Sequence, residues 1–509
     1  MAQVYMSTIR RKEPESIHGW YLDAELALLV GEERAALALY EKVFAACPDY
    51  LSDLAFRIGA LHAGQGRRAE AQRYWASPNA GAEALRWLRR FALEDSLRAH
   101  PVPFNPEPIE GLATSADEFL AVRSPDGSKW YLTRRRNVVD RKSGPAARTY
   151  LEEALCEGIP QDGSVEVRPL EHPFNAGLNE GGPSVSADDQ WMVLTVCAPD
   201  ANGYRNCDLF VAHRELGEWS TLRRLDEAST PTHWESQGAL SANGDRIIFS
   251  SDRPGGRGGL DLWITQRNPD GSWTQPVNLG PAINTDGDEK SPFLHADGRT
   301  LFFSSDGHPG MGGLDVFYTN WTALMQPINL GYPINTEEDE LGFGVHANEP
   351  LGYFSQRREG SGYDLMRFAL PADAAGRQVA FVRGTVDGDL PDGGRPTQIR
   401  IENLKTKSSQ SVVVDAASRR FTAVITREDL ASSVLELEHP ELGYTALRLE
   451  EYLDETEVPA LVARTAAPGV EFALRSILFG TASSELSPED RLALEGFARY
   501  LQRHPEFRI

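Results

Sequence analysis

Apolar positions in the first 100 residues recur at helical spacing and repeat as a block after 35 residues. Three of them recur with this period, since Gly31, Ala36 and Tyr40 correspond to Gly66, Ala71 and Trp75. A small residue lets two antiparallel helices approach closely, and an aromatic residue four positions later fills the groove beside it. The pattern predicts two helical hairpins followed by a third helical stretch over 81–99, all within residues 17–100.

Beyond residue 101 the pattern changes to short apolar runs separated by Gly, Pro, Asp and Ser. A four-residue turn motif begins at five places that lie 51–62 residues apart, at Ser124, Ser186, Ser241, His295 and His346. An apolar run such as 247–250 follows each turn, as expected for hairpins. Four short strands per unit, repeated five times, predict a five-bladed β-propeller over residues 101–370.

The strand count also predicts how this propeller closes. The fifth unit supplies three strands and then ends near Leu370, whereas 104–109 precedes the first unit and has the character of a lone fourth strand. If 104–110 completes the last blade, no edge strand stays unpaired.

Two further pieces follow the propeller. Residues 379–457 alternate apolar and polar positions in about seven short runs, which predicts a small β-sandwich that acts as a spacer. Residues 470–509 combine a strand-like run at 476–480 with an amphipathic helix at 491–501. The predicted fold is therefore multidomain: a short α-helical repeat array, a five-bladed β-propeller, a small β-sandwich and a fragment of an α+β domain.

Composition limits the partners of this chain. It has 509 residues, a net charge of −23 and a mean hydropathy of −0.39. An acidic body repels nucleic acid and anionic lipid surfaces, so neither is expected as a partner. No run of 18 apolar residues occurs, so we predict no transmembrane segment. Residues 1–12 do not resemble an export signal.

Two of the four cysteines lie close in sequence. Cys197 is expected to end the second strand of the second blade and Cys207 to begin the third. The two ends of one hairpin lie near enough for a disulfide, which would indicate an oxidising compartment. Two small buried thiols are the alternative.

Repeated acidic residues are the main candidates for a site. One Glu precedes the first strand of each blade, at Glu118, Glu180, Glu235, Glu289 and Glu340. These carboxylates either ring the axis, where they would bind a cation or a basic peptide, or accept hydrogen bonds from backbone amides. Asp286, Asp288 and Glu289 are calcium candidates, although their loop lacks the ligand spacing of an EF-hand. His295 and His346 are either metal ligands or turn residues.

Signatures of catalysis were sought next. The sequence has no Gly-x-Ser-x-Gly, no His-Glu-x-x-His and no phosphate-binding Gly-rich loop before a helix. We therefore assign no catalytic residue and no cofactor, and we predict that the protein is not an enzyme. Paired carboxylates of a propeller glycosidase cannot be recognised from spacing alone.

Several segments resemble known families. The 35-residue block is similar to tetratricopeptide repeats, and the phrases at 278–285 and 305–313 resemble WD40-like repeats of TolB-type propellers. Residues 382–386 and 443–444 resemble the carboxypeptidase-regulatory-like fold. Residues 476–509 resemble the opening of an OmpA-like peptidoglycan-binding domain, whose ligand-binding Asp and Arg would lie beyond Ile509.

This order of segments resembles peptidoglycan-tethered envelope proteins, including one associated with type IX secretion. The resemblance implies a non-enzymatic scaffold in the periplasm or at the outer membrane, which binds envelope proteins through its helices and propeller. Peptidoglycan binding would need the missing part of the OmpA-like domain, and without it Leu492, Phe497 and Leu501 are expected to form an exposed apolar stripe. The alternative is a propeller glycan hydrolase or lyase. A carboxylate cluster in a substrate-sized axial pocket would favour the hydrolase, and an apolar axis would favour the scaffold.

Overall fold

The computed structural model describes most of the chain. The described residues are 16–140, 148–176, 179–199, 205–215, 217–268, 270–358, 362–388, 390, 397–439, 441–452, 457–465, 486, 488–503 and 505. Contacts divide the chain into two compact units, one holding residues 1–101 with 309–311 and the other holding the remainder. Each unit is described by itself.

The first unit is helical. Its helices are α2 (Ile17–Leu29), α3 (Glu33–Ala46), α4 (Leu54–Gly64), α5 (Arg68–Trp75) and α6 (Gly81–Ala99). Gly31 and Gly66 stand between the helices of each hairpin with φ of +80° and +72°, a conformation that glycine adopts without strain. Ala36 and Ala71 are fully buried, as expected where helices cross. The internal repeat is therefore a pair of α-hairpins followed by a longer helix.

Close packing between α4 and α5 depends on a glycine. A Cβ atom at Gly59 would lie 2.2 Å from Nε1 of Trp75. Trp75 donates a hydrogen bond from Nε1 to the backbone oxygen of Phe56 at 3.1 Å and packs near Trp87 and Phe91. This indole is the largest fully buried side chain in the described part of the unit.

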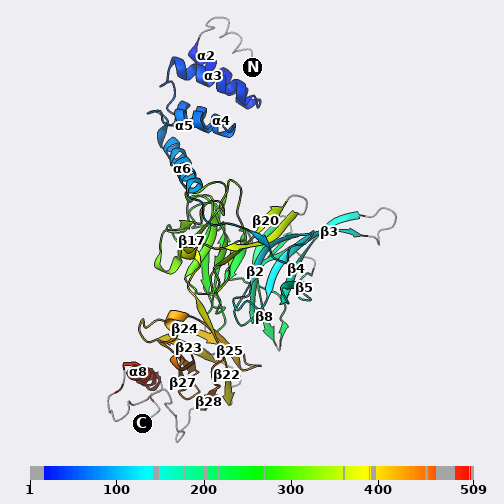
Figure 1. The fold of residues 1–509 in the computed structure, drawn as a ribbon, viewed down its shortest axis with the longest axis vertical. Helices are drawn as coiled ribbons and strands as arrows, with labels where there is room; N and C mark the ends of the chain where they lie inside the picture. The colour runs from blue at the N-terminus through cyan, green and yellow to red at the C-terminus, as the bar shows by residue number, and fades with distance from the viewer. Residues whose placement is uncertain are drawn as a thin grey trace. The chain divides into compact units, whose positions relative to one another are not determined.

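The second unit is mostly β-sheet, and Figure 1 shows its short strands grouped into several sheets. The first sheet has the order β2 (Asp117–Arg123), β3 (Trp130–Asp140), β4 (Arg148–Gln161), β5 (Ser164–Pro169). The second has β6 (Asn179–Val185), β7 (Trp191–Pro199), β8 (Arg205–Glu215), β10 (Arg223–Arg224), with β9 (Glu218–Trp219) also on β8.

Three more antiparallel sheets continue this series. The third contains β11 (Glu235–Leu240), β12 (Arg246–Ser251), β13 (Asp261–Gln266) and β14 (Val277–Asn278). The fourth contains β15 (Glu289–Leu294), β16 (Thr300–Ser305), β17 (Asp315–Asn320) and β18 (Ile328–Asn329). The fifth has the order β19 (Gly344–Val345), β20 (Leu351–Arg358), β21 (Gly362–Ala369), β1 (Glu107–Pro108). The arrangement is propeller-like.

The fifth sheet combines two distant parts of the chain. Glu107 pairs with Arg367 and Pro108 with Met366, so β1 becomes the outer strand of a sheet otherwise built from residues 344–369. This is the closing strand that the strand count predicts. The neighbouring Ile109 is buried against Leu365 and other residues of the core between the first and fifth sheets.

Neighbouring sheets are joined by hydrogen bonds. Tyr131 donates to Asp189 between the first and second sheets, and the amide of Gln237 donates to Thr195 between the second and third. Between the third and fourth sheets Ser250 Oγ donates to the backbone oxygen of Glu289, and between the fourth and fifth Ser304 Oγ donates to the backbone oxygen of Glu340. The Arg123 amide donates to Tyr353 Oη between the first and fifth sheets. The hydrogen bonds therefore run round all five sheets and back to the first.

Two smaller sheets follow. One has the order β25 (Arg420–Thr426), β22 (Val379–Gly388), β28 (Leu461–Ala463), and the other β24 (Ser409–Val413), β23 (Gln398–Asn403), β26 (Ser433–Glu438), β27 (Ala446–Arg448). Apolar side chains from both sheets, among them Val386, Ile399 and Leu435, form one buried core. We call these two sheets the sandwich. A short helix, α7 (Arg427–Leu430), follows β25.

The last described helix is α8 (Pro488–Arg503). Its Phe497 ring lies 5.3 Å from that of Tyr444, and Tyr500 donates a hydrogen bond to the backbone oxygen of Leu442 at 3.0 Å. Tyr500 is buried and Phe497 half-buried. The expected exposed stripe through Phe497 is therefore wrong, because the sandwich supplies the apolar surface that this helix covers. The Leu492 side chain and the strand expected at 476–480 lie outside the described residues.

Candidate functional site

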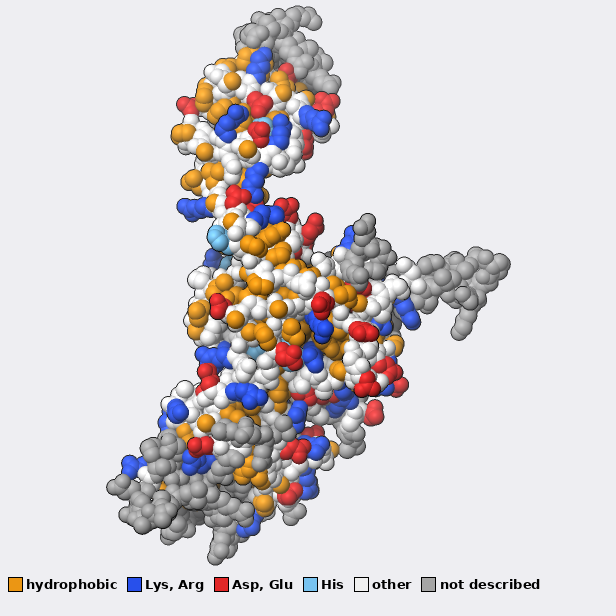
Figure 2. All heavy atoms as spheres, in the orientation of Figure 1, with side chains coloured by type: hydrophobic (Ala, Val, Ile, Leu, Met, Phe, Trp, Pro, Cys, Tyr) orange, Lys and Arg blue, Asp and Glu red, His pale blue; other side chains and the backbone are white. Residues whose placement is uncertain are grey.

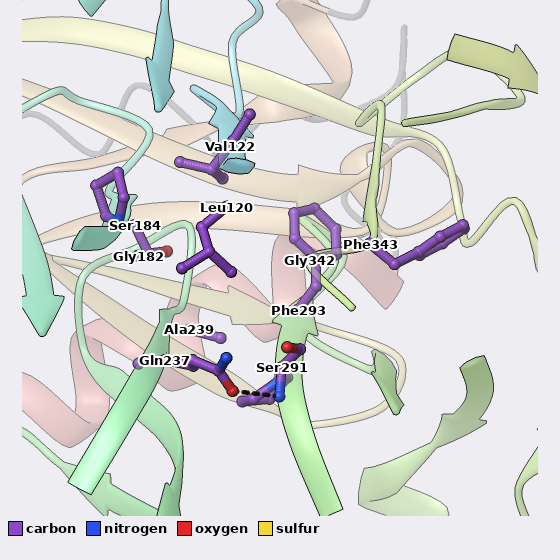
Figure 3. Close-up of a pocket in the computed structure, with 14 residues that line it drawn as sticks. Leu120, Val122, Gly182, Ser184, Gln237, Ala239, Ser291, Phe293, Gly342 and Phe343 are labelled. Atoms are coloured by element: carbon purple, nitrogen blue, oxygen red, sulfur yellow. Dashed lines mark hydrogen bonds between the residues drawn. The ribbon is translucent and has the colours of Figure 1, made fainter. Parts of the chain in front are cut away.

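The innermost strands surround a small axial cavity. Leu120 of β2, Gly182 of β6, Gln237 of β11, Ser291 of β15 and Gly342 before β19 occupy equivalent places in its lining (Figure 3). Each has a positive φ, between +47° and +66°, and the first four lie in β-bulges that interrupt the register with the second strand. Gln237 Oε1 accepts a hydrogen bond from the Ser291 amide at 2.7 Å.

The axial cavity is unsuited to a substrate. Its volume is about 50 Å³, and no carboxylate is among its lining residues, which include Val122, Pro292, Phe293 and Phe343. A ligand site for a small organic molecule needs roughly 300 Å³ or more. The axis is thus apolar and narrow and lacks the axial carboxylate cluster that the sequence led us to expect of a hydrolase, so a reaction on a sugar would have to occur elsewhere.

The five repeated glutamates do not line this cavity. Each carboxylate accepts hydrogen bonds from the loop that leads into its own strand. In four of the five the donors are the amide and hydroxyl of one threonine, at Thr114, Thr230, Thr285 and Thr336 for Glu118, Glu235, Glu289 and Glu340. Glu180 accepts from the amides of Asn175 and Ala176. These side chains hold the loops in place, which matches the second of the two interpretations considered for them.

One member of this set is expected to make stability depend on pH. Burial, together with Asp315 and Asp339 nearby, raises the pKa of Glu340 to about 7, although Thr336 donates two hydrogen bonds to it. Because the folded state holds this proton more tightly than the unfolded state, the free energy of unfolding should fall as the pH rises from about 4.5 to about 7.

Replacing Glu340→Gln should remove that dependence. From pH 5 to pH 8 the free energy of unfolding of the variant should rise by up to about 3 kcal/mol relative to that of the wild type. Urea unfolding at the two pH values measures this change. Glu338→Gln, at an exposed position in the same loop, is the matched control and should leave the free energy of unfolding unchanged at both pH values. Parallel pH profiles for the wild type and Glu340→Gln would contradict the prediction.

The calcium candidates are engaged in other contacts. Asp288 accepts from the Leu260 amide at 2.9 Å and pairs with Lys290 at 2.7 Å, while Glu289 binds its threonine. The side chain of Asp286 is 92% exposed. Within the described residues, no group of three or more His, Cys, Asp or Glu is arranged to hold a metal ion.

His295 and His346 act in the turns. Nδ1 of His295 accepts from the Asp297 amide, and Nδ1 of His346 accepts from the amides of Asn348 and Glu349. Serine oxygens at the corresponding places accept from amides further along the turn; Ser241 Oγ, for example, accepts from the amides of Asp245 and Arg246. Both histidines therefore act as hydrogen-bond acceptors within their turns.

The cysteine pair lies where β7 and β8 face each other. Cys197 is the register partner of Cys207, and the two are joined by a disulfide. Cys47 and Cys156 are present as thiols.

A larger cavity lies between the propeller-like sheets and the sandwich. It has a volume of about 400 Å³, and we call it the cleft. Its propeller wall consists of turn residues that include Asp126, Asp188 and Asp189, and its sandwich wall includes Arg383 and Arg420. Asp415, Ser418, Thr422 and Glu457 complete a polar lining. The volume suits a small organic ligand or part of a longer one.

Two carboxyl groups in the cleft have opposite environments. Burial raises the pKa of Asp188, although Ser186 Oγ and the Gln190 amide donate hydrogen bonds to it. Burial acts on Asp126 in the same direction, but hydrogen bonds from Ser128 and Ser124 and the nearby Arg383 guanidinium outweigh it and lower the pKa of Asp126. The first carboxyl favours the protonated form and the second favours the ionised form.

Sequence reasoning missed the cleft. Asp126 and Asp188 appeared there only as members of the repeated turn motif, and Arg383 as part of a strand. The usable signal was that the turn at 186–189 carries Asp at both of its last positions, where Gly ends three of the other turns. The distance in sequence between Asp126 and Arg383 gave no reason to join them.

No helix within the described part of the chain combines the length and apolar character needed to cross a lipid bilayer. Figure 2 shows Lys and Arg side chains interspersed with Asp and Glu on the surface in view.

No family model and no curated protein matches the chain. Among solved structures, a puromycin-hydrolyzing peptidase from Mycobacterium tuberculosis is similar at 15% identity and a TM-score of 0.32, covering 60% of this chain and 46% of the peptidase. A thermostable family-43 glycoside hydrolase is similar at 13% identity and a TM-score of 0.34, covering 53% of this chain and 92% of the hydrolase. An alpha-L-arabinofuranosidase from Lactobacillus brevis is similar at 12% identity and a TM-score of 0.32, covering 52% of this chain and 92% of the arabinofuranosidase.

These comparisons correct the family prediction. The structures just named are hydrolases, and none is an OmpA-like or tetratricopeptide protein. The predicted membership of the OmpA family is wrong, as are the predicted peptidoglycan binding and the association with a secretion system. The physical reason is that Gly-rich turns and small residues at helix crossings are required by the local backbone, so unrelated proteins share them.

The functional prediction is corrected as well. A non-enzymatic scaffold was expected, whereas the similar structures are a peptidase and two glycoside hydrolases. At TM-scores near 0.3 this likeness carries no argument about the reaction or substrate of this chain. The function is therefore argued from its own cleft.

Proposed function

We propose that the protein is a glycan hydrolase whose reaction takes place in the cleft, with Asp188 as general acid and Asp126 as the ionised carboxylate. What carries the proposal is that these two residues, which hold corresponding turn positions in adjacent sheets, line the same cavity. Glycoside hydrolysis ordinarily uses two carboxyl groups on either side of the bond that breaks.

The pKa shifts support the division of roles. A general acid must hold its proton near neutral pH, and burial raises the pKa of Asp188 in that direction. The partner must be ionised, as the lowered pKa of Asp126 favours. Asp188 would protonate the leaving oxygen, while Asp126 would either activate a water molecule or attack the sugar carbon.

The rest of the cleft fits a hydroxyl-rich ligand. Its lining includes Gln190, Ser418 and Thr422, which offer hydrogen-bond donors and acceptors, and Arg420, an exposed guanidinium. We further propose that 101–370 forms one closed five-bladed propeller and that 379–457 forms a separate sandwich domain. The Cys197–Cys207 disulfide supports a location in an oxidising compartment such as the periplasm.

The test is hydrolysis of a panel of aryl glycosides and polysaccharides by the purified chain. Asp188→Asn and Asp126→Asn should each lower kcat/KM about 100-fold or more on any substrate that is cleaved. Asp387→Asn, an exposed position on β22 that does not line the cleft, is the matched control and should keep full activity. Thermal unfolding should show that all three variants are folded.

Two results would overturn the proposal. One is the absence of cleavage across the panel. The other is cleavage that Asp188→Asn and Asp126→Asn leave at the level of Asp387→Asn.

A further inference from the structure

The sandwich is attached to the propeller-like sheets through the repeated turns. The third residue of three turns accepts a hydrogen bond from a backbone amide of the segment 377–424. The pairs are Val424 to Asn243 at 3.1 Å, Arg377 to Asp297 at 3.0 Å and Val379 to Asn348 at 2.8 Å. Asn243 also donates to Gln410 at 2.9 Å.

Apolar contacts reinforce this attachment. Ala187, Ala242 and Ala347, each the second residue of its turn, pack with Val379 and Val424 in one buried cluster. Four of these five side chains are less than 7% exposed. Turn and sandwich are therefore held in one arrangement at these positions.

The two cleft carboxyls hold the same turn position but differ in their contact with the sandwich. Asp126 accepts a hydrogen bond from Nη2 of Arg383 at 2.9 Å. Both carboxylates also accept hydrogen bonds within their own turns, Asp126 from Ser124 and Ser128 and Asp188 from Ser186 and Gln190. Asp188 interacts electrostatically with Arg267 of the propeller-like sheets. The sandwich thus adds a guanidinium to the turn hydrogen bonds that Asp126 already accepts.

We propose that Arg383 is the positioning residue that assigns the two roles, keeping Asp126 as the ionised carboxylate and leaving Asp188 as the acid. This inference rests on the proposed function. It makes the sandwich part of the reaction site instead of a spacer, because the guanidinium comes from β22 and the carboxylate from the turn after β2.

The geometry of Arg383 suits this role. Its strand is fixed on both sides, since Arg383 pairs with Thr422 of β25 and its backbone oxygen accepts from the Val458 amide at 2.8 Å. Its side chain is 36% exposed and that of Asp126 is 18% exposed. A charge-assisted hydrogen bond at this depth orients the carboxylate as well as stabilising its charge.

Several other charged side chains line the cleft together with Asp126. Asp188 and Asp189 line the cleft from the next sheet, and Asp189 is already paired with Lys129 at 2.5 Å and Arg214 at 3.0 Å. From the sandwich side the cleft receives Asp415, Arg420 and Glu457. Of the cations named, Arg383 is the one with a recorded hydrogen bond to Asp126, so its removal should leave an excess of negative charge beside that carboxylate.

The test uses the full chain with Arg383→Met and Arg383→Lys, and with Arg419→Met as a matched control at a neighbouring position that does not line the cleft. In Arg383→Met the acidic limb of the pH profile of kcat/KM should move upward by about one pH unit. Arg383→Lys should restore part of the shift, and Arg419→Met should show none. A loss that is equal at every pH would mean that Arg383 is merely structural and would overturn the inference.

A second measurement separates this inference from the proposed function. Carboxyl carbon NMR of protein labelled at aspartate, with the Asp126 signal identified from Asp126→Asn, should show that the pKa of Asp126 rises by about one unit in Arg383→Met. If that rise occurs in a protein that cleaves no glycan, the contact between Arg383 and Asp126 stands and the hydrolase proposal fails. If cleavage occurs and neither the titration nor the pH profile moves, the role of Arg383 is refuted and the hydrolase proposal stands.

Discussion

Arg253→Met should lower the free energy of unfolding by about 3–5 kcal/mol. Arg253 reaches back from the loop after β12 and donates from Nη2 to Glu235 at 3.0 Å and from Nε to Ser251 at 3.0 Å. Its side chain is 10% exposed, and that of Glu235 is fully buried. Removing the guanidinium leaves a buried carboxylate without its countercharge, which costs more than the ion pair itself contributes.

Urea unfolding at pH 7.5 measures this loss. Arg253→Met combined with Glu235→Gln should regain part of it, because no buried charge is then left without a partner. Arg257→Met is the control, since this arginine lies in the same loop with its side chain 46% exposed, and it should change stability by no more than about 0.5 kcal/mol. A double variant no more stable than Arg253→Met would contradict the explanation.

The pH dependence of this variant provides a second check. Burial already raises the pKa of Glu235, and the Arg253 guanidinium is one of the groups that opposes the rise. Without Arg253 the carboxyl should hold its proton more tightly in the folded state. The folded state is then favoured less as the pH rises, so the loss of stability should be larger at pH 8.5 than at pH 6.

Trp75→Ala should destabilise the helical unit by about 3–5 kcal/mol. The side chain is 1% exposed, stacks with Phe56 and Trp87 and lies 5.4 Å from the Phe91 ring. Truncation removes these contacts and the hydrogen bond to Phe56. Gly59, which lies against Trp75, has no side chain that could move into the cavity left by the truncation.

Denaturation followed by the helical circular dichroism signal measures this effect. The helical transition should move to lower denaturant, while the transition of the sheet signal stays in place because Trp75 belongs to the other compact unit. Leu85→Ala on α6 is the control, because Leu85 is 53% exposed. A loss below about 1 kcal/mol in Trp75→Ala would show that the cavity collapses and would contradict the prediction.

Local patterns predicted the elements of this fold well. The turn motifs at Ser124, Ser186, Ser241 and His295 open hairpins in the structure, and the residue that ends them has a positive φ in Gly127, Asp189, Gly244 and Gly298. The pairing of 107–108 with β21 followed from counting strands, because an unpaired edge is costly wherever a sheet can be completed. Cys197 and Cys207 follow the same logic, since the two ends of one hairpin are close whatever the rest of the chain does.

Family and function could not be obtained in this way. The same turns, small residues and alternating strands satisfy the backbone in many unrelated proteins, so the expected OmpA-type scaffold had no physical basis beyond those shared local needs. The acidic ring shows a similar limit. Glu118, Glu180, Glu235, Glu289 and Glu340 were correctly seen as equivalent, but equivalence in sequence does not say which way a carboxylate turns.

By itself the sequence determined the helical hairpins, the repeated four-stranded units and the closeness of Cys197 to Cys207, because contacts between neighbours in sequence decide each of these. The pairing of 107–108 with β21 joins distant parts of the chain and was reached by counting strands instead. Only the tertiary structure decided that the glutamates turn to loop amides, that α8 covers the sandwich, and that Asp126 and Asp188 share a cleft. The guanidinium that contacts Asp126 belongs to Arg383, which is 257 residues away in sequence. Charge and burial at such a contact exist only once the chain has folded, and no local pattern records them.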